Sequence, residues 1–175
     1  MLFDLNQVKK NRRRAEKLGK KNFLLHVACK NLEGRVAELG LSLGDVMVLS
    51  AKEIDFTELG RELIIKYSDY FNHGLIKKKV DLILNILNLH WSNDPKKDLS
   101  NQMDLLKPGG IFIGCLFGAD TLNELRDSFF KAELQISGKA RPRISPLPEI
   151  RDIGNLAQNV GMKRVVADKE TITVE

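Results

Sequence analysis

Cysteines, aromatic residues and long apolar runs are all scarce in this sequence of 175 residues. The two cysteines, Cys29 and Cys115, lie far apart in apolar stretches, which indicates small core residues in a reducing compartment rather than a disulfide framework. Aromatic residues make up 6% of the chain, with a single tryptophan. The apolar run over 80–91 is shorter than the ~18 residues of a membrane-spanning helix and is interrupted by Asp81 and two asparagines. We therefore expect no disulfide framework and no membrane span.

Catalytic signatures are scarce as well. His26 and Cys29 are three residues apart, but two potential ligands without a third do not make a metal site, so no metal is expected. The sequence contains neither a Gly-x-Ser-x-Gly motif nor a phosphate-binding loop of Walker type. With 43% hydrophobic and 29% charged residues, the chain is typical of one ordered globular domain. A cytoplasmic location is expected for a bacterial protein, and the mitochondrial matrix for a eukaryotic one.

The positive charge is concentrated in one segment. Residues 9–21, "KKNRRRAEKLGKK", contain eight Lys or Arg and one Glu. Three interpretations remain open: a solvated helix face, a surface for an acidic partner (nucleic acid, anionic lipid or an acidic carrier protein), or a targeting presequence. Asp4 and Glu16 argue against a presequence, which is poor in acids. No aromatic residues interleave with the charges, so nucleic-acid binding is not expected.

Apolar periodicity in the first half predicts helices over 5–18 and 22–39, a strand over 45–51, a short helix near 55–61 and a strand over 62–68. We expect residues 1–40 to form a basic helical extension and 41–175 an α/β domain, together making one compact unit.

The second half carries stronger signals. The run over 80–87 is apolar on both faces, as in a parallel strand covered by helices. Asn93 or Asp94 can cap a helix with Pro95 at its first position, and "KPGG" (107–110) is expected to stop it before a strand over 111–118. The "TLNE" spacing (121–124) predicts a capping box and a helix with Leu122, Leu125, Phe129 and Ala132 facing inward.

A proline-stiffened loop over 137–148 comes next, then a helix near 149–160 that buries Ile150, Ile153, Leu156 and Val160. "RVVA" and "TITVE" are predicted to form a terminal hairpin. The fold class that follows is α/β, a reduced Rossmann-like fold with N-terminal helices, a mostly parallel sheet of about six strands and an antiparallel hairpin. Exposed strand edges in a shortened sheet would favour a homodimer.

The stretch "LILNILNLHWSND" (82–94) begins as a buried strand and ends in polar and aromatic residues. In parallel sheets, ligands bind at the carboxyl ends of strands beside a topological switch point. Asn88–Trp91 and Gly118–Thr121 are therefore candidates for a ligand crevice. Helix initiation explains Asn93 and Asp94 equally well.

Several longer motifs carry a family resemblance. "VDLILNILNLHWSNDPKKDLSNQMDLLKPGGIFIGCLFG" has the layout of the fourth and fifth strands of class I S-adenosylmethionine (SAM) methyltransferases. Five further motifs make the resemblance more specific: "LFD", "NRRRAEK", "NFLLHVA", "GADTLNELR" and "RPRISPLPEIRDIGNLAQNVGMKRVVADKETITVE". The chain resembles the branch that contains the mitochondrial complex I assembly factor five, an arginine hydroxylase of methyltransferase fold, and its bacterial relatives. The biotin-pathway malonyl carrier-protein methyltransferase is a more distant neighbour.

The resemblance implies SAM as cofactor, bound between the strand tips near Ser50 and Leu87. Asp69 and His90 are the other implied cofactor-binding residues, and Asn85, an amide inside the strand that needs a hydrogen-bond partner, is a further candidate. Asp69 could equally lie on a surface loop, Asn85 could be satisfied by the backbone or water, and His90 could pack beside Trp91 to position the next helix.

The implied substrate is a protein or a carrier-bound group, and Trp91, Arg141 and Arg143 are its candidate contacts. The two arginines flank Pro142 in a stiff loop and could hold a carboxylate. An internal salt bridge in this region, such as Arg151 with Glu149 or Asp152, is the alternative. Trp91 could instead belong to the core or the crevice wall.

The chain departs from the family after its first strand. SAM-binding members carry an acidic, glycine-rich loop there, whereas this chain has "SAKEIDFTELG", in which Gly60 is the first glycine. About 30 residues then lead to the strand at 80–87, room for one strand–helix unit instead of two. The sequence thus leaves three possibilities open: a SAM-dependent methyltransferase, a non-catalytic assembly or chaperone-like protein of the respiratory complex I type, or a gene product that has retained no function.

Overall fold

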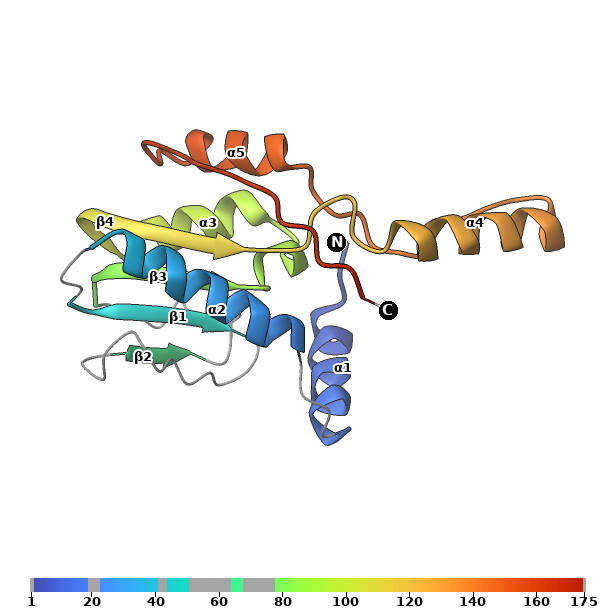
Figure 1. Ribbon diagram of the computed structural model, residues 1–175, viewed down its shortest axis with the longest axis horizontal. Coiled ribbons are helices and arrows are strands. Elements are labelled where there is room, and N and C mark those ends of the chain that lie inside the picture. The colour runs from blue at the N-terminus through green and yellow to red at the C-terminus, as the bar shows by residue number, and fades with distance from the viewer. Residues whose placement is uncertain (1, 19–22, 41–43, 51–63, 68–77, 175) are drawn as a thin grey trace. The chain divides into compact units, whose positions relative to one another are not determined.

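The computed structural model describes residues 2–18, 23–40, 44–50, 64–67 and 78–174. The helices are α1 (Leu5–Lys17), α2 (Phe23–Glu38), α3 (Pro95–Met103), α4 (Asn123–Ser137) and α5 (Ile150–Asn159), together with the 3-10 turn η2 (Leu89–Trp91). The strands are β1 (Val46–Ser50), β2 (Ile64–Tyr67), β3 (Val80–Ile86) and β4 (Leu106–Cys115) (Figure 1).

The chain forms two compact units, Met1–Leu116 and Phe117–Glu175, which are described one at a time. The first unit contains α1, α2 and the whole described sheet, so its boundary differs from the division after residue 40 that the sequence suggested.

The described sheet has the order β2-β1-β3-β4, and all three strand pairs are parallel. All five residues of β1 and six of the seven in β3 are buried, as expected for central strands covered on both faces. The prediction of a Rossmann-like α/β fold with a mostly parallel sheet is confirmed. Four strands lie in the described residues, compared with the six expected.

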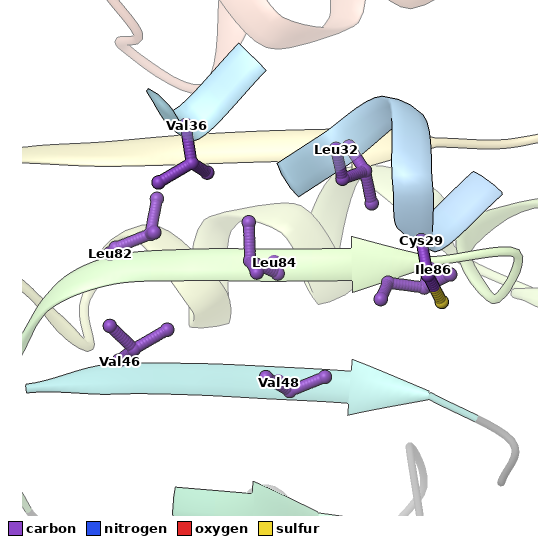
Figure 2. Close-up of a cluster of buried hydrophobic side chains, with 8 residues drawn as sticks. All are labelled: Cys29, Leu32, Val36, Val46, Val48, Leu82, Leu84 and Ile86. Atoms are coloured by element: carbon purple, nitrogen blue, oxygen red, sulfur yellow. The ribbon is translucent and has the colours of Figure 1, made fainter. Parts of the chain in front are cut away.

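Helices cover both faces of the sheet. Figure 2 shows the face under α2, where side chains from α2, β1 and β3 form one cluster: Cys29, Leu32, Val36, Val46, Val48, Leu82, Leu84 and Ile86. On the other face, Met47, Leu49 and Ile83 pack with Met103 of α3. Burying each such side chain contributes about 1.5–3 kcal/mol. Burial, and then the nearby Cys115, raise the pKa of the Cys29 thiol to about 11, as befits a core residue.

The segment "KPGG" lies inside a strand. β4 begins at Leu106, and its pairing with β3 shifts register between Val80 and Leu82. Pro108 has no N–H for the ladder and Gly109 has a φ of 79°, so these residues form a bulge. The prediction that they separate the helix from a strand starting at 111 was wrong.

Charged side chains tie the amino ends of the strands together. Lys107 Nζ lies 2.9 Å from Asp81 Oδ2 and 3.3 Å from Asp45 Oδ2, and Lys78 Nζ is 2.8 Å from Asp45 Oδ1. Asp81 Oδ2 also accepts from the backbone N–H of Asp45 at 2.7 Å. These contacts fix the end of the sheet opposite the predicted ligand edge.

Helix α3 begins as predicted. Asp94 is its N-cap and accepts from the backbone N–H of Lys97 at 3.0 Å, and Pro95 occupies the first helical position.

In the second unit, the start of α4 differs from the prediction. The helix follows Leu122, whose φ is 58°, and no side chain caps it, so the expected capping box does not form. Leu122, Leu125 and Phe129 are 55%, 43% and 44% exposed, and the prediction that they face inward was wrong. A left-handed residue rotates the chain out of the geometry that a capping box needs.

The end of the chain also differs. α5 forms where predicted, but Ile150 is exposed instead of buried and Ala157 is the buried residue of this helix. Residues 162–174 contain no strand, so the hairpin prediction was wrong. Two short strands without a sheet to join are marginal in water, and the "DKE" turn lacks the glycine or asparagine that favours tight hairpins.

Candidate functional site

The topological switch point lies between β1 and β3. From β1 the chain goes to β2 on one side, while β3 and β4 lie on the other. The carboxyl ends of β1 and β3 therefore flank the position where open parallel sheets bind ligands. Ser50, the last residue of β1, is buried and pairs in register with Ile86.

The chain makes a strained turn as it leaves β3. Leu87 has a φ of 50°, uncommon for a leucine, and its N–H donates to the carbonyl of Cys115 at 2.9 Å. A left-handed leucine costs roughly 1–2 kcal/mol, and such residues concentrate near functional sites. Of the predicted cofactor residues, the structure thus places Ser50 and Leu87 at the two adjacent strand ends.

Asn88 connects three parts of this edge. The side chain is fully buried; its Nδ2 donates to the carbonyl of Leu49 at 2.8 Å and its Oδ1 accepts from Arg12 Nη2 at 2.9 Å. α1 therefore lies beyond the carboxyl ends of the strands, with Arg12 at the switch point (Figure 1). Arg12 was not predicted from the sequence, because within a basic run no pattern distinguishes the residue that turns inward.

His90 is neutral at pH 7. Burial, and secondarily the positive charge of Arg12, lower the pKa of this imidazole to about 4. Its ring centroid lies 5.4 Å from that of Trp91, and Trp91 in turn meets Phe3 edge-to-face at 5.3 Å. His90 is therefore packed beside Trp91, the arrangement considered as an alternative, at the edge where the resemblance places the cofactor.

Asn93 does not cap α3. Its Oδ1 accepts from the backbone N–H groups of Leu2 and Phe3, both at 2.7 Å, and its Nδ2 donates to the carbonyl of Phe3 at 2.9 Å. The two polar residues that end "LILNILNLHWSND" thus have separate roles: Asp94 starts the helix and Asn93 holds the N-terminal segment.

Asn85 lies one layer deeper. The residue is 1% exposed, and its Nδ2 donates to Gln102 Oε1 on α3 at 2.9 Å. Among the described residues, neither Asn85 Oδ1 nor Gln102 Nε2 has a hydrogen-bond partner. A buried acceptor left unsatisfied costs roughly 1–3 kcal/mol, so this pair carries an uncompensated polar cost inside the first unit.

Three predicted residues lie elsewhere. Asp69 is outside the described residues, as is the loop that follows β1. Arg141 and Arg143 belong to the second unit, where both bind Glu133: the N–H of Arg141 donates at 2.7 Å, and Arg143 donates through Nε at 2.6 Å and pairs through Nη2. These contacts lower the pKa of Glu133. An internal ion pair thus forms in this region, with Glu133 as the acid; the substrate role of both arginines stays a prediction.

Metal-binding clusters and membrane spans are both absent from the described part of the chain. None of the His, Cys, Asp and Glu side chains there form a group of three suited to a metal ion. No helix among these residues is long and apolar enough to cross a membrane.

Comparison with known proteins identifies relatives of two kinds. Arginine-hydroxylase NDUFAF5 of Dictyostelium discoideum is 41% identical over 101 residues, which is 58% of this chain and 23% of that protein. A Rickettsia prowazekii protein named as a methyltransferase is 37% identical over 99 residues (57% and 44%). The malonyl-[acyl-carrier protein] O-methyltransferase of Xylella fastidiosa is 31% identical over 112 residues (64% and 36%). No family model matches the chain.

The matched regions span less than half of the length of these relatives. Among solved structures, a SAM-dependent methyltransferase from Thermotoga maritima superposes with a TM-score of 0.53 at 16% identity, covering 87% of this chain and 79% of that one. This structural likeness shows the fold of the chain. The sequence matches add which proteins the chain is similar to within that fold. Over 57–58% of its length the chain is therefore similar to arginine-hydroxylase NDUFAF5 and to a bacterial protein named as a methyltransferase, and its fold is that of SAM-dependent methyltransferases.

Proposed function

We propose that this chain binds SAM at the switch point and acts as a methyltransferase on a protein or carrier-bound substrate, in the cytoplasm or the mitochondrial matrix. The observation that carries the proposal is the convergence of Ser50, Leu87, Asn88 and His90 on the carboxyl ends of two adjacent parallel strands. Catalysis in such enzymes rests mainly on placing the methyl donor in line with a nucleophile, so few acid–base groups are required.

The described residues fit the cofactor in two respects. A neutral His90 can lie beside the positively charged sulfonium without repulsion. The unpaired Oδ1 of Asn85 can accept a hydrogen bond from a donor such as the cofactor's ammonium group. Ser50 and Leu87 would flank the ligand, and Asp69 is the remaining candidate contact. When bound, SAM would supply an electrophilic methyl group.

The basic face of α1 supports an acidic partner. Lys10, Arg13 and Arg14 are exposed on the helix that Arg12 anchors to the switch point. An acidic protein surface, such as that of a carrier protein, would be drawn to this side of the molecule. Trp91 is a candidate substrate contact on the same side, and Arg141 and Arg143 are candidates in the second unit.

A non-catalytic binding or assembly protein is the second candidate. The observation that favours it is the loop after β1, where Lys52, Glu53 and Ile54 stand in place of the small residues that let a backbone approach the cofactor. The matched relative NDUFAF5 is named as an arginine-hydroxylase and not as a methyltransferase.

Calorimetric titration with SAM and S-adenosylhomocysteine separates the two candidates. Micromolar binding that weakens at least about tenfold in Asn85→Leu or Asp69→Asn supports the enzyme. Asp127→Asn, at an exposed carboxylate of α4 in the second unit, is the control and is expected to leave binding unchanged. Absence of heat and of any thermal shift at millimolar cofactor would exclude the enzyme and leave the binding protein.

A further inference from the structure

The N-terminal residues are held as a peptide ligand is held. The Asn93 amide makes three hydrogen bonds, all to the main chain of Leu2 and Phe3: two accepted at 2.7 Å and one donated at 2.9 Å. A side-chain amide carries the same donor and acceptor groups as a peptide bond, so Asn93 pairs with the main chain of this segment, which bends at Phe3 and directs two consecutive N–H groups to one oxygen. Such contacts recognise a bent main chain whatever its side chains.

One side chain of the segment is recognised as well. Phe3 is 8% exposed and its ring meets Trp91 edge-to-face at 5.3 Å, whereas Leu2 is 62% exposed. Aromatic pairs of this geometry contribute about 0.5–1.5 kcal/mol beyond burial. Trp91 and Asn93, which we call the Trp91–Asn93 clamp, therefore select a bent segment with an aromatic residue at one position.

The clamp lies at the ligand edge of the sheet. The clamp lies in the segment that follows β3, and His90 lies between Asn88 and Trp91 in the sequence. The occupying segment continues into α1, where Arg12 reaches Asn88 at 2.9 Å. A peptide in this clamp would therefore lie beside the switch point at which a cofactor is proposed to bind.

We propose that the Trp91–Asn93 clamp is a recognition site for a bent, aromatic-containing segment of a protein substrate, and that residues 2–3 of this chain occupy it in cis. The segment acts as an internal competitor that a substrate peptide displaces. The identity of the partner as a substrate rests on the proposed function; the clamp itself does not require SAM.

Competition in cis determines what an experiment should detect. A tethered segment acts at an effective concentration of about a millimolar or more. A free peptide should therefore bind the wild-type chain weakly and a chain with a vacated clamp much more tightly. Phe3→Ala removes the aromatic anchor but leaves Trp91 and Asn93 in place.

Fluorescence titration of the full chain provides the test, because Trp91 is the single tryptophan. The probe is an acetylated and amidated peptide of residues 2–8, LFDLNQV, added without SAM. We expect a saturable change in Trp91 emission in Phe3→Ala, with affinity at least about tenfold tighter than for the wild type. The peptide LADLNQV should bind Phe3→Ala at least about tenfold more weakly than LFDLNQV does. LFDLNQV should bind the double variant Phe3→Ala/Asn93→Ala at least about tenfold more weakly than it binds Phe3→Ala. Equal responses to the two peptides, or no response at all, would overturn the proposal.

A second measurement needs no substitution. In the wild-type chain, millimolar LFDLNQV should accelerate hydrogen exchange at the amides of Leu2 and Phe3, which Asn93 otherwise protects. Unchanged exchange at saturation would show a permanent structural contact and reject the proposal. Dimers that form in a concentration-dependent way, with residues 2–3 of a second copy in the clamp, would contradict the proposal that a protein substrate binds there. Because SAM is absent throughout, these results are independent of the cofactor titration.

Discussion

At the scale of single residues, the carboxyl edge of the sheet is organised by amide side chains. Asn85, Asn88 and Asn93 follow β3 or lie within it, yet their partners differ. Asn85 binds Gln102 inside the unit, Asn88 joins β1 to α1, and Asn93 holds residues 2–3. Nothing in the identity of these asparagines distinguishes one role from another. The sequence located the edge, and only the three-dimensional contacts assigned the partners.

His90 should make the stability of the first unit depend on pH. Its folded-state pKa of about 4 lies below the ordinary value of 6.5, so the unfolded chain binds the proton more readily. The free energy of unfolding should therefore fall as pH decreases from about 6.5 to about 4, by up to about 3 kcal/mol from this group. His90→Gln, measured by urea unfolding at several pH values, should remove that part of the dependence.

The control for His90 is His26→Gln, because His26 is exposed on α2. It should leave the dependence between pH 6.5 and 4 as in the wild type. A His90→Gln chain that loses stability with acid as steeply as the wild type would show that burial of this imidazole is not the cause. Asp45 and Asp81, whose pKa values are lowered chiefly by hydrogen bonds from Lys78 and Lys107, act at lower pH, because their contribution is lost only as they protonate.

At the scale of elements, the start of β4 depends on glycine. A Cβ added to Gly110 would lie 2.9 Å from the carbonyl oxygen of Lys107 and 3.2 Å from that of Asp81, both backbone atoms that cannot move aside alone. We expect Gly110→Ala to destabilise the first unit by about 1–3 kcal/mol. Chemical unfolding followed by circular dichroism measures the change.

Gly34→Ala is the matched control for this strand. Gly34 lies in the interior of α2, and no atom lies within 4 Å of an added Cβ. Alanine should stabilise the helix there by about 0.5–1 kcal/mol. If both substitutions changed stability in the same direction, the close approach at the β4 bulge would not be the determining factor.

At the scale of the whole molecule, burial is uneven between the two units. The central strands of the first unit are almost fully buried, whereas α4 has no buried residue and exposes Phe129, Phe130 and Leu134. Local opening is easiest where few apolar side chains are covered. We expect the amides of α4 to exchange with solvent at least about 100-fold faster than those of β3, as measured by hydrogen exchange with mass spectrometry. Equal protection would show that these side chains are covered in solution.

The secondary-structure elements that were predicted correctly are those in which adjacent sequence signals agree. β3 was located by a two-sided apolar run and α3 by a cap followed by proline, and both were confirmed. α4 has a clear apolar pattern, but periodicity predicts a face and not the surface that covers it. The strand-like "TITVE" failed for a related reason, since strand propensity is expressed only beside a partner strand. Arg12 could not be found at all, because its role depends on contact with a residue 76 positions away.

The Asn93 contact also sets an order of events in time. It joins residues 2–3 to a side chain about 90 positions later, so these residues are synthesised well before their partner. At about 5–20 residues per second, Phe3 is added to the chain roughly 5–18 s before Asn93. Throughout that interval Phe3 lacks its aromatic partner, and the segment can dock only after β3 and η2 have been synthesised.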